Sequence, residues 1–584
     1  MQANLSSVQA SAPRRKLTYD IPYFGTLDTT TDTALMNETS TPDALNLVYD
    51  SVRSVASRKG YTKLLTTAAP SPIGGMFSYY KSDATKKILF SSGSNLRTYD
   101  NAGGSTVVVG TPATFTPNLQ WSFDEYNDSA YGGNGTDPLI AYNGLTYSIA
   151  NSGITPQFVK INKNRVYCAN KNSSTLYFSD AGNPNSFPVN NFIQINTNDG
   201  QNITGIEVIN DSVIIFKDDS IWILTGDPLG AGNITTIGNL QLRKANTNVG
   251  CTAFRTIQKI DSVLFFMHYT GIYIFQNNAA VCISDVLTNT FQNGMNQGFV
   301  NLCWSVYDGL NNIYVMGFPS STSTKCDKAI VYNGVSKTLM IWDDIPGSCG
   351  VVYRFSGFNA TMVFGDPNKG NIYNLLQGYA DIAGDNGSAT SGTTTTIVDT
   401  TKSWTTNQFA DARVKIVAGS GAGSTSVVLS NTSNTLTLVS AFSVAPTLGS
   451  TYSIGYYDSY WTTKNFDFKM TGYSKKYRFF NLFADSQLYN IKFGSSVDFL
   501  TLAYQKPLVL ASGALVWGQA GLVWGVNSGN WGTYSSEFVQ ANIGGTGRYI
   551  KFKFGNDIAN QPWRVIKYSI SYKLKKMRPN IAST

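Results

Sequence analysis

The sequence contains a single histidine, His268, in 584 residues. A Ser-His-Asp triad or a histidine-based metal site would depend on that one imidazole. It lies in FFMHYTG, at the end of an apolar run, where we expect a packed or turn residue. The six cysteines form no C-x-x-C pair, and no cluster of metal-ligating residue types is evident. We therefore expect no metal, no cofactor and no enzymatic activity.

Charged residues are also scarce, at 14% of the chain, against roughly 25% in an average soluble protein. Glutamate, a good helix former, occurs only four times, so we expect few helices. No window approaches 18 apolar residues, and the first residues lack the apolar run of a signal peptide. We expect no membrane span and no export signal. Cysteines in apolar runs such as NLCWSVY suggest free thiols and assembly in a reducing cytoplasm.

Small polar and aromatic residues make up what the chain lacks in charge. It has 53 glycines, 33 tyrosines and 32 phenylalanines. Aromatic side chains suit a pleated surface, and glycine and asparagine suit tight turns. The composition therefore predicts an all-β protein. Its length exceeds that of one ordinary core, which predicts several domains or one large repeat architecture with additions.

One pattern recurs along the chain. The stretch DSVIIFKDDSIWILTG is followed by the similar DSVLFFMHYTGIYIFQN. The first apolar residue of each core strand gives successive spacings of 47, 50, 50 and 49 residues, at Val166, Val213, Val263, Ile313 and Met362. Two weaker copies begin at Ile88 and Ile140. They are 52 residues apart, although Ile140 precedes Val166 by only 26.

Each copy comprises an apolar strand, a polar turn and a second strand rich in aromatic residues. Shorter β signals between the copies bring the total to about four strands a repeat, which is typical of β-propeller blades. We expect about seven blades over residues 76–383, and the irregular spacing leaves six or eight open. Residues 1–75 would wrap the ring and supply a closing strand.

Two further domains are expected after the repeats. The Gly/Ser/Thr-rich stretch GDNGSATSGTTTT indicates a boundary, and residues 384–455 then read as a small inserted β module. In this module the sequence Asn-Thr-Ser-Asn predicts a hairpin turn. Residues 456–584 alternate between apolar and polar side chains, as in RYIKFKF, which predicts a C-terminal β-sandwich.

Positive charge is concentrated in this last part. Residues 456–584 contain 16 Lys and Arg against 6 Asp and Glu, a net charge of +10. Since the whole chain carries +8, the remaining residues carry −2. Such a basic part fits double-stranded DNA, an acidic protein neighbour, or simply a lysine-studded solvated sheet. Among these we favour protein partners for KYSISYKLKKMRP.

Three tryptophans recur at a spacing of seven residues, each followed by glycine. The glycines oppose a heptad helix, and a hairpin that pairs ALVW with GLVW fits better. The tryptophans would either fill the sandwich core or form an apolar tip that docks a partner subunit. Together with the last basic residues, they give the candidates for partner interfaces: Trp517, Trp524, Trp531, Lys573, Lys575, Lys576 and Arg578.

Four stretches carry a resemblance to known proteins. They are YDIPYFGTLDTTTDTALMNE with SVRSVASRKGY, NRVYCANKNSSTLYFSDAGNPNSF with its continuation, the module with DTTKSW and VVLSNTSNTLTLV, and WTTKNFDF with VIKYSISYKLKKMRP. In these the chain resembles the β-propeller tail proteins of tailed phages, especially the nozzle or hub proteins of short-tailed phages.

The resemblance implies a structural virion protein without enzymatic activity. Such proteins form a homohexameric ring at the distal tail that continues or gates the DNA channel and docks fibres or adaptor proteins. The DNA would pass without sequence-specific binding, and assembly would take place in the host cytoplasm. The alternative is a propeller glycan-binding protein or glycoside hydrolase, since SDAGNPNSF loosely resembles the Asp-box turn of sialidase blades. It lacks the Ser-x-Asp-x-Gly order and occurs once.

Overall fold

The computed structural model describes residues 16–50, 52–101, 103–227, 240–356, 359–485, 489–510, 514–515, 530–531 and 536–575. These residues form an all-β protein, which confirms the predicted fold class at that level. The helices within the described ranges are five short turns: η1 (Thr197–Asp199), η2 (Phe254–Thr256), η3 (Asp285–Leu287), η4 (Thr290–Gly294) and η5 (Gln297–Leu302).

The chain forms two compact units. Unit 1 combines Met1–Arg58 with Asp458–Thr584, and unit 2 is the continuous stretch Lys59–Tyr457. Unit 2 is therefore inserted into the sequence of unit 1. Residues 1–75, expected to wrap and close a ring, are divided between the units at Arg58, because most of their strands pair with C-terminal strands.

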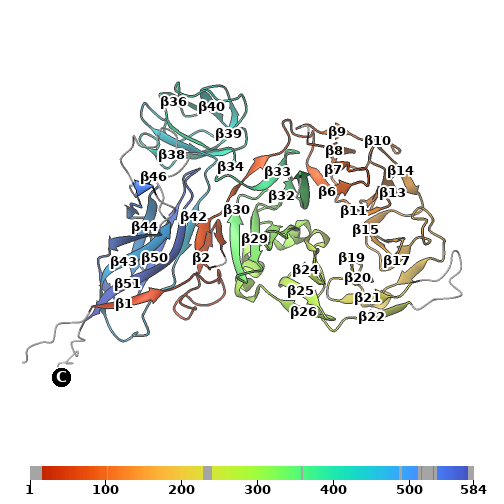
Figure 1. Cartoon of the computed structure of the whole chain (residues 1–584), viewed down its shortest axis with the longest axis horizontal. Helices are drawn as coiled ribbons and strands as arrows, with labels where there is room; N and C mark the ends of the chain where they lie inside the picture. The colour runs from red at the N-terminus through yellow and green to blue at the C-terminus, as the bar shows by residue number, and fades with distance from the viewer. Residues whose placement is uncertain are drawn as a thin grey trace, which may run out of the picture. The chain divides into compact units, whose positions relative to one another are not determined.

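Unit 2 contains seven small sheets, numbered here in chain order. Sheet 1 holds β6 (Ile73–Tyr80), β7 (Lys86–Ser92), β8 (Asn95–Tyr99) and β9 (Thr106–Val107). Sheet 2 holds β10 (Val109–Gly110), β11 (Ser122–Tyr126), β12 (Ser129–Gly133), β13 (Leu139–Tyr142) and β14 (Thr146–Asn151). Sheet 3 holds β15 (Pro156–Asn162), β16 (Arg165–Asn170), β17 (Thr175–Phe178) and β18 (Phe192–Gln194). Figure 1 shows these sheets in orange and yellow.

The remaining four sheets follow the same plan. Sheet 4 holds β19 (Gly205–Ile209), β20 (Ser212–Phe216), β21 (Ile221–Thr225) and β22 (Gln241–Lys244). Sheet 5 holds β23 (Gln258–Ile260), β24 (Val263–His268), β25 (Gly271–Gln276) and β26 (Ala279–Cys282). Sheet 6 holds β27 (Trp304–Asp308), β28 (Ile313–Phe318), β29 (Lys328–Asn333) and β30 (Thr338–Asp343). Sheet 7 holds β31 (Cys349–Ser356), β32 (Asn359–Gly365), β33 (Ile372–Gln377), β5 (Gly60–Lys63) and β34 (Asp381–Ile382).

Tight two-residue turns connect many of these strands. The pairs Asn127-Asp128, Lys163-Asn164, Asn210-Asp211 and Asn277-Asn278 have positive φ at both residues. Positive φ at both central residues is the type I′ geometry, whose twist matches that of antiparallel strands. Asparagine and aspartate adopt this conformation at low cost. Local sequence thus fixes the register of these hairpins.

Six of the seven repeat anchors lie in the second strand of their sheets, for example Val213 in β20 and Val263 in β24. Ile140 is the exception, because it lies in β13, which is the third strand of sheet 2 when the strands are counted from β11. The strand of sheet 2 that corresponds to the other anchors is β12. The short spacing from Ile140 to Val166 therefore reflects a misplaced anchor.

Neighbouring sheets pack against each other in chain order. The ring centroids of Phe216 in sheet 4 and Phe266 in sheet 5 are 5.2 Å apart. Those of Phe265 in sheet 5 and Tyr314 in sheet 6 are also 5.2 Å apart. The contacts also return from the last sheet to the first, since Tyr80 stacks on Tyr353 at 6.1 Å. Figure 1 shows the seven sheets arranged around a common centre. Buried apolar clusters also join sheet 1 to sheet 2, sheet 2 to sheet 3 and sheet 3 to sheet 4, and Trp304 of sheet 6 stacks on Phe364 of sheet 7.

The strand β5 completes sheet 7 from the far end of the chain. It pairs antiparallel with β33, with Tyr61 opposite Leu375. Tyr61 is buried and contacts Phe364 and Tyr373, with ring centroids at 5.3 and 5.0 Å. Residues 60–63 of the N-terminal segment therefore form a strand of sheet 7, and the closing of a ring by this segment stays a prediction.

A seven-stranded sheet follows sheet 7 in unit 2. It holds β35 (Asp385–Ser388), β36 (Ser391–Thr393), β37 (Thr396–Val398), β38 (Arg413–Ala418), β39 (Thr425–Asn431), β40 (Thr435–Leu438) and β41 (Thr451–Ile454). The hairpin predicted at Asn-Thr-Ser-Asn joins β39 to β40. Asp411 connects this inserted module to sheet 7, because it binds Lys63 at 3.0 Å and also binds Lys369.

Unit 1 consists mainly of two sheets. The seven-stranded sheet holds β1 (Leu17–Ile21), β3 (Leu47–Tyr49), β4 (Val55–Ser57), β43 (Lys475–Asp485), β48 (Ser536–Asn542), β49 (Thr546–Gly547) and β51 (Arg564–Leu574). The five-stranded sheet holds β2 (Asp43–Leu45), β42 (Ser459–Thr462), β44 (Ile491–Val497), β45 (Lys506–Leu508) and β50 (Ile550–Asn556). Both sheets contain strands from the two ends of the chain.

Aromatic side chains join the two sheets of unit 1. Phe480 of β43 lies 4.8 Å from Phe493 of β44 and 4.7 Å from Phe552 of β50. The predicted alternation in RYIKFKF is confirmed, since Ile550, Phe552 and Phe554 are buried while the lysines between them are half-buried. The apolar face of β50 thus points toward the seven-stranded sheet.

Candidate functional site

The predicted interface residues divide into those that the structure describes and those that it does not. Trp517, Trp524, Lys576 and Arg578 lie outside the described residues. The backbone of Trp531 belongs to the short strand β47 (Asn530–Trp531), which pairs in parallel with β46 (Ala514–Leu515). The predicted partner of ALVW, the stretch GLVW, also lies outside the described ranges. The described candidates are Lys573, in β51, and Lys575, which is exposed just after it.

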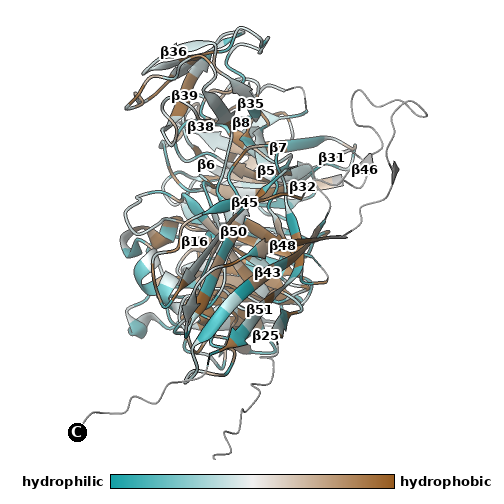
Figure 2. Cartoon of the chain, turned by 90° about the vertical axis from the view of Figure 1, so that its left-hand side faces the viewer, coloured by the Kyte–Doolittle hydropathy of each residue, from teal (hydrophilic) through white to brown (hydrophobic). Residues whose placement is uncertain are grey.

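Lys573 belongs to one face of the seven-stranded sheet, the face opposite to Tyr568, Ile570 and Tyr572. We call this the outer face and define it by Lys16, Lys476, Lys567, Lys573, Phe479, Phe483 and Phe538. Strand pairing places these residues together, because residues opposite each other on neighbouring strands share a face. Figure 2 shows this part of unit 1 with teal, hydrophilic residues along β43.

Two lysines stand directly opposite each other at one end of this face. Lys476 of β43 pairs with Lys573 of β51 in the antiparallel register. Lys476 is exposed and Lys573 is half-buried. Like charges in this arrangement destabilise a sheet, by roughly 0.2–1 kcal/mol for a directly opposed pair. An acidic group bound between them would remove that repulsion.

Lysines and phenylalanines alternate across the rest of the outer face. The ammonium group of Lys567 lies 4.5 Å from the centre of the Phe483 ring, whose other neighbour is Phe538 at 5.2 Å. Lys16 lies 4.8 Å from the ring centre of Phe479. Phe538 is 55% exposed, and it lies on β48, an edge strand of the sheet. This end of the outer face is therefore basic and partly apolar.

The sheet beneath the lysines is held by buried polar contacts. Lys475 is fully buried and donates hydrogen bonds to the carbonyl oxygens of Met470, Tyr473 and Arg548, at 2.7, 3.1 and 2.9 Å. Burial lowers the pKa of Lys475. In the centre of the face, Asn481 donates to Ser569 and accepts from Gln540, both at 2.9 Å. The lysine rows thus rest on a fixed sheet.

The outer face was found only in part from the sequence. The predicted partner stretch KYSISYKLKKMRP contains Lys567 and Lys573, but Lys476 lies outside it. Alternation in KYRFFNLFAD indicates a half-buried strand, and only the pairing of β43 with β51 brings its lysine to Lys573. Chemically, the face offers ammonium groups that suit binding of acidic groups, and aromatic rings that attract and position two of these ammonium groups.

His268 occupies a turn of sheet 5. Its Nδ1 lies 2.7 Å from the hydroxyl of Thr270, and its Nε2 lies 3.4 Å from Oδ1 of Asp219. Burial lowers the pKa of His268, although the Asp219 carboxylate opposes this change. Thr270 is the second residue after His268, so the contact is that of a local turn. The arrangement agrees with the predicted packed or turn histidine.

The stretch that resembles an Asp-box is likewise a hydrogen-bonded turn. Its carboxylate, on Asp180, accepts from the Ser186 hydroxyl at 2.7 Å and from the Asn191 amide at 3.3 Å. The main-chain N–H of Asp180 also donates to the Ser186 carbonyl. These contacts give Asp180 a structural role within sheet 3.

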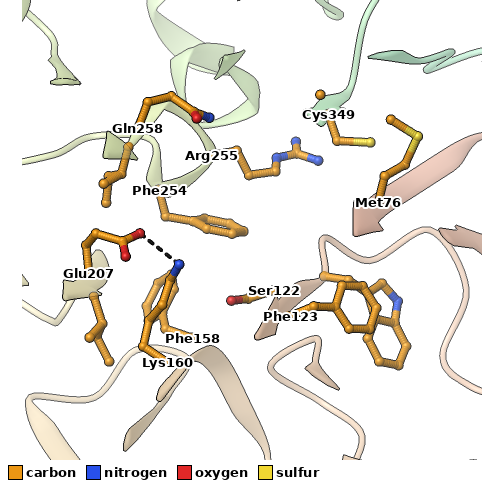
Figure 3. Close-up of a pocket in the computed structure, with 14 residues that line it drawn as sticks. Met76, Ser122, Phe123, Phe158, Lys160, Glu207, Phe254, Arg255, Gln258 and Cys349 are labelled. Atoms are coloured by element: carbon orange, nitrogen blue, oxygen red, sulfur yellow. Dashed lines mark ion pairs between the residues drawn. The ribbon is translucent and has the colours of Figure 1, made fainter. Parts of the chain in front are cut away.

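A cavity of about 130 Å³ in unit 2 is lined by residues of β6, β11, β15, β19, β23 and β31, which belong to six of the seven sheets. Figure 3 shows Lys160 and Glu207 on one side of it and Arg255 on the other. The ammonium group of Lys160 binds the Glu207 carboxylate at 2.7 Å. Glycoside hydrolysis needs two carboxyl groups that face one substrate, and Glu207 is the only acidic residue among those that line this cavity.

No group of three or more His, Cys, Asp or Glu residues in the described ranges could hold a metal ion. No helix in the described part of the chain is long and apolar enough to cross a membrane.

Comparison with known proteins gives distant likenesses in fold. No family model and no curated protein matches the chain. The computationally designed protein Ika8 matches with 12% identity and a TM-score of 0.33, over 54% of this chain and 99% of its own. An extracellular domain of a putative hybrid two-component system from B. thetaiotaomicron matches with 10% identity and a TM-score of 0.37. The match covers 59% of this chain and 44% of that domain's chain. The N-terminal domain of Nup159 matches with 10% identity and a TM-score of 0.33, over 57% of this chain and 100% of its own. TM-scores this low carry no argument about fold or function.

Proposed function

We propose that this protein is a structural component of a phage tail, in which several copies form a ring around the DNA path. In this proposal the seven sheets of unit 2 are the blades of a β-propeller and unit 1 is a β-sandwich. The sequence resemblance to nozzle and hub proteins motivates it. The cyclic order of contacts among the seven sheets supports the propeller, and the aromatic layer between the sheets of unit 1 supports the sandwich.

The outer face of unit 1 is the observation that carries the functional part of the proposal. Its opposed lysines, Lys476 and Lys573, suit an acidic partner. We assign this partner to a neighbouring tail protein or a second copy, because DNA in a channel must slide past. Strong contacts to each phosphate would hold it in place.

The central cavity of unit 2 is not a route for DNA in this proposal. A volume of about 130 Å³ is far too small for a duplex. The DNA path would instead lie between copies, on the axis of the ring. The local turn contact of His268 and the ion pair of Glu207 with Lys160 support a structural role over the alternative of a glycoside hydrolase.

Imaging by negative-stain electron microscopy tests the ring. We expect the purified full chain, alone or with its tail neighbours, to form closed rings of six copies with a bore wide enough for duplex DNA. A monomer that is retained on a polysaccharide column would contradict the ring and favour a glycan-binding protein.

Charge reversal tests the outer face. We expect the double variant Lys476→Glu/Lys573→Glu to fold and to lose tail assembly, since it would repel an acidic partner. The matched control is Lys244→Glu/Lys259→Glu, which makes the same charge change at exposed positions of unit 2. Normal assembly of the outer-face variant, or of one with Lys573, Lys575 and Lys576 neutralised, would refute this partner surface. A loss of duplex DNA binding with intact assembly would assign the face to DNA instead.

A further inference from the structure

A second cavity of unit 2 lies beside Arg255, with a volume of about 460 Å³. Ligand pockets in proteins commonly measure roughly 300–1,000 Å³. Its walls include apolar residues such as Leu119 and Leu302, together with the polar side chains of Asn118 and Gln120. Arg255 also lines the smaller cavity, so this one side chain stands at the boundary of both.

Cations without acidic partners distinguish the larger cavity. Arg255 and Lys325 line it, and no aspartate or glutamate is among its lining residues. The Lys325 ammonium donates to the carbonyl of Pro367 at 2.7 Å and to the amide oxygen of Asn368 at 2.8 Å. Both acceptors are neutral, so the lysine charge is solvated by dipoles and remains uncompensated.

Arg255 is held in the same way. Its Nη1 donates to the Gly74 carbonyl at 3.2 Å, and its Nη2 approaches the Leu302 carbonyl at 3.5 Å. Its Nε is buried without a hydrogen-bond partner. A guanidinium has five N–H donors, so most of them remain available. Figure 3 shows the side chain extending toward Cys349 and Met76, both of which are neutral.

The one acidic residue of the smaller cavity does not balance this charge. Glu207 is bound to Lys160 at 2.7 Å, and Figure 3 shows the pair on the other side of Phe254 from Arg255. Burial lowers the pKa of Arg255, with no carboxylate to oppose the change. Burying a cation without a counter-ion is costly. The guanidinium of Arg255, which carries this unfavourable charge, lines both cavities.

We propose that the cavity between Arg255 and Lys325 binds a small organic anion, through a carboxylate or phosphate group. The planar guanidinium presents paired N–H donors that match such oxyanions, and carbonyl contacts fix its orientation in advance. The apolar walls hold the body of the ligand. This inference does not depend on the ring or on its place in a phage tail.

Anion titrations of the full chain test the site. Inorganic phosphate and benzoate are the two probes, compared with chloride at constant ionic strength, and the readouts are the melting temperature and isothermal calorimetry. We expect at least one probe to bind saturably and to raise the melting temperature above that in chloride. A response to phosphate indicates a phosphorylated ligand, and a response to benzoate indicates a carboxylic acid. No saturable response to either probe would overturn the proposal.

Variants locate the binding. Arg255→Gln is expected to weaken binding by about tenfold or more, and Arg255→Lys by less, because lysine keeps the charge without the paired donors. The control is Lys87→Met, which removes a lysine that also donates to a carbonyl, that of Gly144 at 2.9 Å, away from both cavities. Equal binding by wild type and Arg255→Gln would refute the site.

A second variant protects the test from misfolding. Lys325 is exposed, so Lys325→Met should fold even if Arg255→Gln does not. We expect Lys325→Met to weaken probe binding severalfold, and unchanged affinity would contradict the two-cation site. In chloride alone, Arg255→Gln should melt no lower than wild type, because it removes an uncompensated cation.

Discussion

At the scale of single residues, Arg564 is where three distant stretches of unit 1 meet. It lies on β51 and binds both oxygens of Asp485, at the end of β43, at 3.0 and 2.8 Å. It also binds Asp50, which follows β3, with its Nε at 3.1 Å. Burial would raise the pKa of Asp50, but hydrogen bonds from Ser54 and Arg564 outweigh it and leave that pKa lowered.

Replacing Arg564 should therefore destabilise unit 1. We expect Arg564→Gln to lower the free energy of unfolding by about 1–2 kcal/mol, since the pairs are partly exposed. Denaturant unfolding at pH 7 measures this change. Part of the difference should vanish as the pH falls through the lowered pKa of Asp50, because the protonated carboxyl binds the cation weakly. The control is Arg478→Gln, an exposed residue of β43; an equal loss in both variants would contradict the role of the network.

His268 makes a second prediction, on pH dependence. Its pKa is lowered in the folded protein, so the unfolded chain takes up the proton first as the pH falls. The free energy of unfolding should therefore decrease between pH 7 and 5, by at most about 1.4 kcal/mol per pH unit for this one group. His268→Gln should reduce that slope in equilibrium unfolding. An identical slope in the variant would contradict this role of His268.

At the scale of elements, β5 shows how a short strand can hold a larger structure. It lies between β33, to which it runs antiparallel, and β34, to which it runs parallel. Residues from two ends of unit 2 thus share one sheet. Tyr61 fills the centre of this arrangement against two aromatic rings.

Truncation of that side chain should be costly. We expect Tyr61→Ala to destabilise unit 2 by about 3 kcal/mol, because a large buried ring leaves a cavity that the sheet fills poorly. Differential scanning calorimetry of the full chain should show a lower transition for unit 2. Tyr269→Ala, which removes a ring that is 51% exposed, is the matched control and should change little. A loss of equal size in both would contradict the packing role of Tyr61 in sheet 7.

Elements whose signals are local were predicted well from the sequence. The strands around Val213 and Val263 repeat a pattern of apolar residues and asparagine or aspartate turns, and the structure has hairpins there. The repeat anchor at Ile140 was wrong because β13, where it lies, is as apolar as β12, the strand that corresponds to the other anchors. Pairing between distant segments, such as β1 with β51, leaves no local mark. The outer face depends on such a pairing, so the sequence revealed Lys573 but not its neighbour Lys476.

At the scale of the whole molecule, the order of the units along the chain governs folding. Every strand of unit 2, including β5, lies within residues 59–457. In unit 1, in contrast, β1 and β4 are partners of β51 and β2 is the partner of β42, so strands from residues 17–57 pair with strands near the C-terminus. Unit 1 is therefore complete only after the last strand has been synthesised.

Fragments test this order. We expect residues 59–457 to fold alone with a cooperative thermal transition. Residues 458–584 alone should lack one, because several strands have lost their partners. Adding the peptide 1–58 to the second fragment should restore a cooperative transition, measured by circular dichroism. A stable fold of 458–584 without the peptide would contradict the interdependence of the two chain ends.

The pairing of β1 with β51 also determines how the protein would respond to mechanical force. Leu17 at the start of β1 lies opposite Tyr572 near the end of β51, so β1 begins and β51 finishes at the same end of this strand pair. Tension between the ends would pull these strands apart like a zipper, one hydrogen bond after another, and not shear them together. Until unit 1 opened, unit 2 would carry none of that load, because both of its connections lie beyond the first strands to part.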